Sequence, residues 1–214
     1  MGAKTWMLVY ADGRASELLK YYPALDPEAT TSLAKRLFPS ATLEPIENGD
    51  LSQTCPRDDT IYIGCFPGVS IIAAKEFGID YPSKLAPTFL EAAGKASVYL
   101  HAMHSVMDWF AYATWTDGEL QRSLSLSPDS GILEDIGQRA DFEKPYWSGQ
   151  RPVFDGEAEG NSYPFPFHPL ELGEAALLEL FGYRIEGPVD SNQIEPERIP
   201  LLGFRRRKKR WKLW

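Results

Sequence analysis

Residues 97–126, SVYLHAMHSVMDWFAYATWTDGELQRSLSL, decide the fold because their pattern is that of consecutive β-strands. Residues 97–104 and 108–115 are rich in strand-forming residues, and residues 119–126 alternate leucines with Gln and Ser. Thr116-Asp117-Gly118 between the last two has the composition of a tight turn. The stretch therefore predicts one strand followed by an amphipathic hairpin.

Other strand-like segments lie outside this stretch. Residues 5–11 predict a buried first strand, and residues 42–47 predict an edge strand. Residues 60–66 and 69–75 enclose Pro67-Gly68, a spacing that predicts an apolar hairpin deep in the core.

Helix signals occur between and after the strands. Asp26 before Pro27 predicts the start of a helix that ends at Leu37, and residues 169–181 predict a last helix that stops at Gly182. We also expect helices over residues 16–22 and 83–93 and a short helical turn over residues 132–136, capped by Ser130. The mixed order predicts an α+β fold with a mixed, largely antiparallel sheet and helices packed on it.

Composition limits the organisation and the location. A chain of 214 residues with 43% hydrophobic content fits one domain, which we place at residues 1–204. We find no apolar run of the roughly 20 residues that a membrane span requires and no signal peptide, so we expect a cytoplasmic protein. The two cysteines, Cys55 and Cys65, predict free thiols, with Cys65 buried in a strand.

The charge is distributed unevenly. The net charge of the chain is −8, yet seven of its 22 basic residues lie within residues 205–212. The rest of the chain therefore has 15 basic and 30 acidic residues. We expect residues 205–214 to form a mobile tail with two tryptophans, which either rests on the acidic body or contacts an anionic lipid surface or nucleic acid. The basic residues for this contact are Arg205, Arg206, Arg207, Lys208, Lys209, Arg210 and Lys212.

Several stretches together carry a family resemblance, namely MGAKTWMLVYADG, YIGCFPG, YLHAMHSVMDWFAYATW, SLSLSPDSG, PYWSG and FHPLELGEAAL. In these the chain resembles an uncharacterised bacterial family known as a domain of unknown function. The resemblance covers most of residues 1–183 and implies no substrate, cofactor or catalytic residue. The basic ending after Phe204 is not part of the pattern.

Histidines are the first chemical candidates, because two of the three lie in His101-Ala102-Met103-His104. An H-x-x-H spacing binds one metal ion when the backbone is helical, whereas residues three apart on a strand face opposite sides. His168 and Asp108 would be the further ligands or partners. The alternative is that the strand histidines are hydrogen-bonded in the structure and that His168 caps a helix, which we favour. We predict no metal and no cofactor.

The loop at residues 127–131 is a second candidate. Ser127 and Ser130 are possible nucleophiles, as is Cys65, but none lies in a nucleophile elbow. Hydroxyls and backbone N–H groups before a helix favour an anion, while Asp129 opposes one. An ordinary turn is the simpler interpretation.

Carboxylates and aromatic residues complete the set of candidates. Asp108 interrupts an apolar run, and Glu134 with Asp135 forms an acidic pair suited to general acid and base roles. Tyr146 and Trp147 either wall a ligand pocket or plug the core above the hairpin.

Two classes of function follow. The first is a binding or regulatory protein that recognises a protein or a small molecule, with the basic tail aiding contact with an anionic surface. The second is a small hydrolase that uses His101 or His104 with Asp108 near residues 127–130. We favour the first, since the sequence has no compact catalytic signature.

Overall fold

One antiparallel sheet organises the chain, and the computed structural model describes residues 2–153, 164–187 and 190–208 of it. The strand order is β2-β10-β4-β5-β1-β6-β7-β8-β9, with β3 beside β10, and every strand pair in the described residues is antiparallel. The strands are β1 (Lys4–Ala11), β2 (Ala41–Pro45), β3 (Gly49–Asp50), β4 (Thr60–Phe66), β5 (Val69–Ala73), β6 (Ser97–His104), β7 (Trp109–Thr116), β8 (Glu119–Ser127), β9 (Gly131–Gly137) and β10 (Pro200–Lys208). The predicted α+β class and both predicted hairpins are confirmed.

The longer helices begin and end where their sequence signals predict. Asp26 caps α2 by accepting a hydrogen bond of 2.9 Å from the Ala29 N–H, and Gly182 ends α5 in the left-handed region, with a φ of 83°. The α-helices are α1 (Ala15–Leu19), α2 (Pro27–Leu37), α3 (Pro87–Ala92), α4 (Lys144–Trp147) and α5 (Pro169–Phe181). The 3-10 turns are η1 (Lys75–Phe77), η2 (Pro82–Lys84), η3 (Asp141–Glu143) and η4 (Pro196–Arg198).

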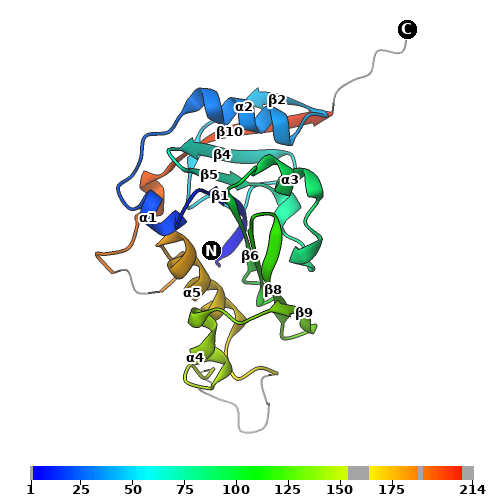
Figure 1. The fold of residues 1–214 in the computed structure, drawn as a ribbon, viewed down its shortest axis with the longest axis vertical. Coiled ribbons are helices and arrows are strands. Elements are labelled where there is room, and N and C mark those ends of the chain that lie inside the picture. The colour runs from blue at the N-terminus through cyan, green and yellow to red at the C-terminus, as the bar shows by residue number, and fades with distance from the viewer. Residues whose placement is uncertain (1, 154–163, 188–189, 209–214) are drawn as a thin grey trace.

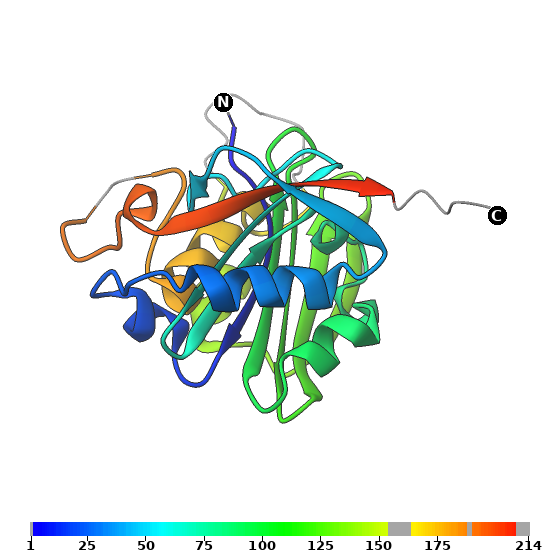
Figure 2. The same ribbon diagram turned by 90° about the horizontal axis from the view of Figure 1, so that it is seen from above.

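Helices cover both faces of the sheet (Figures 1 and 2). On one face α2 and α3 bury Leu33, Leu37 and Phe89 in a cluster with apolar residues of β1, β4 and β6. On the other face α1 and α5 pack Leu19 and Phe181 on β1 and β5. Because the central strands are buried on both faces, they are apolar at successive positions, whereas a sheet with one wet face would alternate.

Two predicted helices differ from the structure. Residues 83–93 form η2 and the short α3, because Ala86 precedes Pro87 and takes an extended conformation, with φ −58° and ψ 133°. Residues 132–136 are not helical, since they lie in β9 and pair with β8. Alternate residues of β9 point to opposite faces, which directs Glu134 and Asp135 apart.

The predicted tail begins too early. Strand β10 continues through Arg205, Arg206 and Arg207 to Lys208 and pairs with β2 on one side and β4 on the other. Cross-strand and nearby carboxylates explain the extension, because Arg206 forms an ion pair with Glu76, and Arg207 Nε lies 2.7 Å from Glu44 Oε2. Residues 209–214 of the predicted tail lie outside the described residues.

Two truncated chains, ending at Phe204 and at Lys208, test whether the end of β10 stabilises the fold. A chain ending at Phe204 loses the ladder between the end of β10 and β2, and each hydrogen bond of this kind contributes about 0.5–1.5 kcal/mol. We expect the free energy of unfolding in urea to fall by about 2–4 kcal/mol. A chain ending at Lys208 is the control and should unfold like the full chain. Equal stability of the two truncated chains would contradict this pairing.

Candidate functional site

Strand β6 places His101 and His104 on opposite faces of the sheet. His101 is fully buried, with Nε2 3.0 Å from the Gly173 carbonyl oxygen of α5 and Nδ1 2.7 Å from Thr5 Oγ1 of β1. Since a carbonyl only accepts, Nε2 donates to it and the Thr5 hydroxyl donates to Nδ1. Burial lowers the pKa of His101 to about 4. His101 therefore joins two strands to α5 as a neutral side chain.

His104 faces the layer of α2 and α3. Its ring centroid lies 5.7 Å from that of Trp6, and its buried Nδ1 has no hydrogen-bond partner in the part of the chain that the structure describes. Burial lowers the pKa of His104, as does the charge of Lys4. The two strand histidines do not share a site. Among the described residues, no group of three or more His, Cys, Asp or Glu side chains is placed to hold a metal ion.

Asp108 and His168 come together at the end of the sheet. Asp108 lies in the β6–β7 turn with a φ of 45°, and its Oδ2 is 3.6 Å from His168 Nε2. His168 is the N-cap of α5, where Nδ1 accepts a hydrogen bond of 3.2 Å from the Leu170 N–H. The predicted cap is confirmed, and His168 is the histidine that meets Asp108.

A cleft of about 790 Å³ adjoins this pair. Its wall includes His168, Tyr146, Arg184 and the buried Glu174 of α5. Burial raises the pKa of Glu174, while the N–H groups of Ile185 and Glu186, which donate to its two oxygens, oppose the shift. We call this the His168 cleft.

Tyr146 and Trp147 lie in α4 and pack on the aromatic cluster beneath the hairpin. The Tyr146 hydroxyl donates to the Glu171 carbonyl oxygen over 3.1 Å, and the Trp147 ring meets Phe167 edge to face at 4.8 Å between centroids. Tyr146 packs in this cluster and also lines the His168 cleft.

The loop at residues 127–131 is the turn between β8 and β9. The Ser130 N–H donates to Ser127 Oγ over 3.1 Å, and Gly131 has a φ of 69°. A strand and not a helix follows, so the helix N-terminus that favoured an anion is absent from this loop. Asp129 is exposed, and Ser127 is buried at the end of β8. Cys65 is buried in β4, as predicted.

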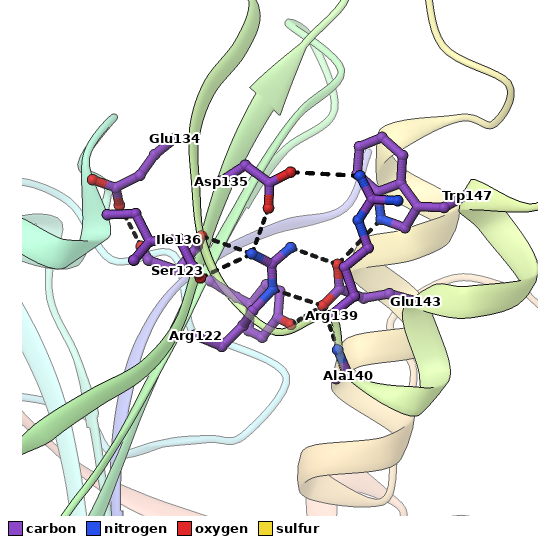
Figure 3. Close-up of polar contacts among 10 residues, drawn as sticks. Arg122, Ser123, Glu134, Asp135, Ile136, Arg139, Ala140, Glu143 and Trp147 are labelled. Carbon is purple, nitrogen blue, oxygen red and sulfur yellow. Dashed lines mark hydrogen bonds and ion pairs between the residues drawn. The ribbon is translucent and has the colours of Figure 1, made fainter.

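A buried charge network lies between β8, β9 and the α4 segment (Figure 3). Arg122 forms two parallel hydrogen bonds of 2.8 Å with Glu143, and its Nη1 is 2.5 Å from Asp135 Oδ1. Glu143 is fully buried and also accepts from the Tyr112 hydroxyl, the Ala140 N–H and the Trp147 indole. Bidentate pairing of this kind is strong and directional.

The network keeps Glu143 ionised. Burial alone would raise the pKa of Glu143, but hydrogen bonds from Arg122, Tyr112 and Ala140, with the charge of Arg122, hold it below its usual value. Glu134 lies on the opposite face, where Ser83 and Ser123 donate to it. The acidic pair in the sequence therefore has two separate structural partners.

Sequence reasoning overlooked Arg122 and Glu143. The available signal was the phase of β8, since Arg122 shares the inward-facing positions of Leu124 and Leu126. A cation in that phase requires a buried anion. Nothing local indicated that the anion would come from η3.

A second cleft, of about 840 Å³, lies at one end of the sheet. Lys4 of β1, Arg57 of the loop before β4 and Arg205 of β10 line it, and none of the described residues in its wall is acidic. The other lining residues are Gly2, Ile46, Ser52, Gln53, Cys55, Pro56, Thr60, Tyr62, Ser105, Val106 and Ile185. We call this the basic cleft.

The cations of the basic cleft are lightly neutralised. Lys4 and Arg57 form no ion pair within the described ranges, and Arg205 Nε lies 3.7 Å from Asp59 Oδ2 with both side chains about half exposed, at 50% and 57%. Pairs of this kind contribute little and are screened by salt. Burial raises the pKa of Cys55, which Lys4 opposes. The cleft therefore gathers three cations on an acidic protein.

Comparison with known proteins gives one match. The model of a protein family described as a family of unknown function matches residues 5–204. No curated protein and no solved structure matches the chain. In the described residues, no helix has the length and apolar character needed to cross a membrane.

Changing one partner of the buried Arg122–Glu143 pair should lower the free energy of unfolding more than replacing both partners. Glu143→Gln leaves Arg122 buried with a weakened partner, and we expect it to lower the free energy of unfolding by about 3–5 kcal/mol. Combining Arg122→Met with Glu143→Leu should cost clearly less than Glu143→Gln alone. Urea unfolding measures both variants, and a loss in the double variant as large as that of Glu143→Gln would contradict the coupling.

Proposed function

We propose that this chain, which belongs to the family of unknown function DUF6928, is a binding protein that holds an anionic group in the basic cleft. The observation that carries the proposal is the convergence of Lys4, Arg57 and Arg205, from distant parts of the chain, on one cleft without a carboxylate in its described wall.

The chemistry of the wall supports an anion. Lysine and arginine bind phosphate and carboxylate oxygens by charge and by N–H donation, and the Ser105 hydroxyl offers a further donor. The hydroxyls of Ser52 and Thr60, also in the wall, already donate to Asp50 and Asp59. The acidic body repels anions elsewhere, so that binding concentrates at this end.

The basic C-terminal sequence begins at the same site. Arg205 belongs both to the cleft and to the run of basic residues, which continues in the sequence with Lys209, Arg210 and Lys212.

Titration with inositol hexakisphosphate, a polyanion probe, tests the proposal. We expect binding that weakens as salt rises, and the double variant Lys4→Ala, Arg57→Ala should bind roughly tenfold more weakly or worse, at about 1 kcal/mol per cation. The matched control, Lys20→Ala with Lys95→Ala, removes the same charge from exposed lysines outside the cleft. Equal losses in both variants would show that only net charge matters and would refute the proposed cleft.

The hydrolase alternative is a second candidate, which the contact between Asp108 and His168 favours. In the His168 cleft, Asp108 would orient the imidazole at Nε2. His168 Nδ1 would act as the base toward a bound water after it releases the Leu170 N–H, from which it accepts in this structure. His101 has no part in this version, because both of its ring nitrogens are occupied inside the fold.

Kinetics of ester and phosphoester hydrolysis by the full chain check this second candidate. We expect His168→Asn and Asp108→Asn each to lower kcat by about a hundredfold, the scale of general base catalysis, while Asp141→Asn, an exposed carboxylate beside Lys144, leaves it unchanged. Activity that survives His168→Asn would exclude His168 as the base.

A further inference from the structure

The β6–β7 turn presents two adjacent apolar side chains to the solvent beside the basic cleft. Val106 and Met107 are 78% and 56% exposed, and Val106 also lines the cleft. Single exposed apolar residues are common, but an adjacent pair at the tip of a hairpin next to a group of cations is a combination that marks binding surfaces.

The turn is held in this exposed position by the fold. The Ser105 N–H donates to the Ala3 carbonyl oxygen over 3.0 Å, and the Met107 N–H donates to the His104 carbonyl oxygen over 3.2 Å. Asp108 closes the turn in the left-handed region and lies against His168. The two apolar side chains therefore project from a fixed support and do not fold back onto the core.

We propose that the anionic group of the basic cleft belongs to the surface of an anionic lipid bilayer, into which Val106 and Met107 insert. This deepens the proposed function and depends on it. Lys4, Arg57 and Arg205 would contact the headgroup phosphates while the turn enters the boundary between headgroups and acyl chains, the arrangement by which peripheral proteins combine charge with apolar burial.

The exposed turn decides in favour of a bilayer over other polyanions. A nucleic acid or a free phosphate compound would use the cations but would give two protruding aliphatic side chains no role. Two carboxylates near this end, Asp59 and Asp108, each lie beside a basic side chain, Arg205 and His168. The whole chain has 30 acidic against 22 basic residues, so an anionic surface repels the protein in orientations that do not use the cations of the cleft.

Flotation of the full chain with vesicles tests the proposal. Phosphatidylcholine vesicles and vesicles that also contain phosphatidylserine are compared, and we expect binding to the second kind alone. The double variant Val106→Ser, Met107→Ser should weaken that binding by about tenfold, because less apolar surface is buried. The control Ile132→Ser, Ile136→Ser changes two exposed apolar residues of β9 and should leave binding unchanged.

The outcomes separate this inference from the proposed function. The proposal of an anionic bilayer would be refuted if the Val106, Met107 variant bound vesicles as well as the unaltered chain. It would also be refuted if the full chain bound a single-stranded oligonucleotide but not vesicles. Titration of the single variant Met107→Ser with inositol hexakisphosphate should give the affinity of the unaltered chain, since Met107 lies outside the cleft wall and the cations remain. Loss of inositol hexakisphosphate binding in the Lys4, Arg57 variant tests the cleft itself.

Discussion

The position of β1 between β5 and β6 is the constraint on which the rest of the structure depends. Its register sets Lys4 opposite His104 and Met7 opposite both Ala73 and His101. Helices cover the middle of the sheet on both faces. Because β1, β6 and β7 are then buried on both faces, their sequences are apolar at successive positions. At one end, the start of β1, the end of β6 and the start of β4 meet β10 and create the basic cleft.

Buried polar groups attach α5 and the segment around α4 to the sheet. His101 joins the sheet to α5 through the Gly173 carbonyl oxygen, and the Arg122–Glu143 pair joins β8 to the segment that holds Tyr146. Each group is fully committed to partners inside the fold, and replacing one partner would leave the other unsatisfied. The residues that carry the strongest buried interactions are thus structural, while the groups left for a ligand lie in the two clefts.

Local signals in the sequence predicted the elements whose causes are local. The turn residues Pro67-Gly68 and Asp117-Gly118, the cap at Asp26 and the glycine stop at Gly182 all marked real boundaries. The helical turn over residues 132–136 failed because pairing with β8 decides that segment. Likewise, the sequence suggests a tail from Arg205 onward because a run of arginines does not look like a strand. The carboxylates that pair with Arg205 and Arg207 are brought beside them only by the folded sheet.

The candidate site was largely beyond prediction for the same reason. Lys4, Arg57 and Arg205 meet only after β10 returns, near the end of the chain, to pair with β4, and no spacing in the sequence records that contact. The pairing of Asp108 with His168 was considered from the sequence, whereas the role that we propose for Val106 and Met107 depends on a turn geometry that appears only in three dimensions.

The central claim is that an anionic group binds in the basic cleft, and its most direct test is a titration of the isotope-labelled full chain with inositol hexakisphosphate, followed by amide chemical shifts in NMR spectra. We expect the largest shifts at Lys4, Arg57, Tyr62 and Arg205, which line the cleft. Largest shifts around His168 and Glu174, or no shifts at the cleft at saturating probe, would contradict it.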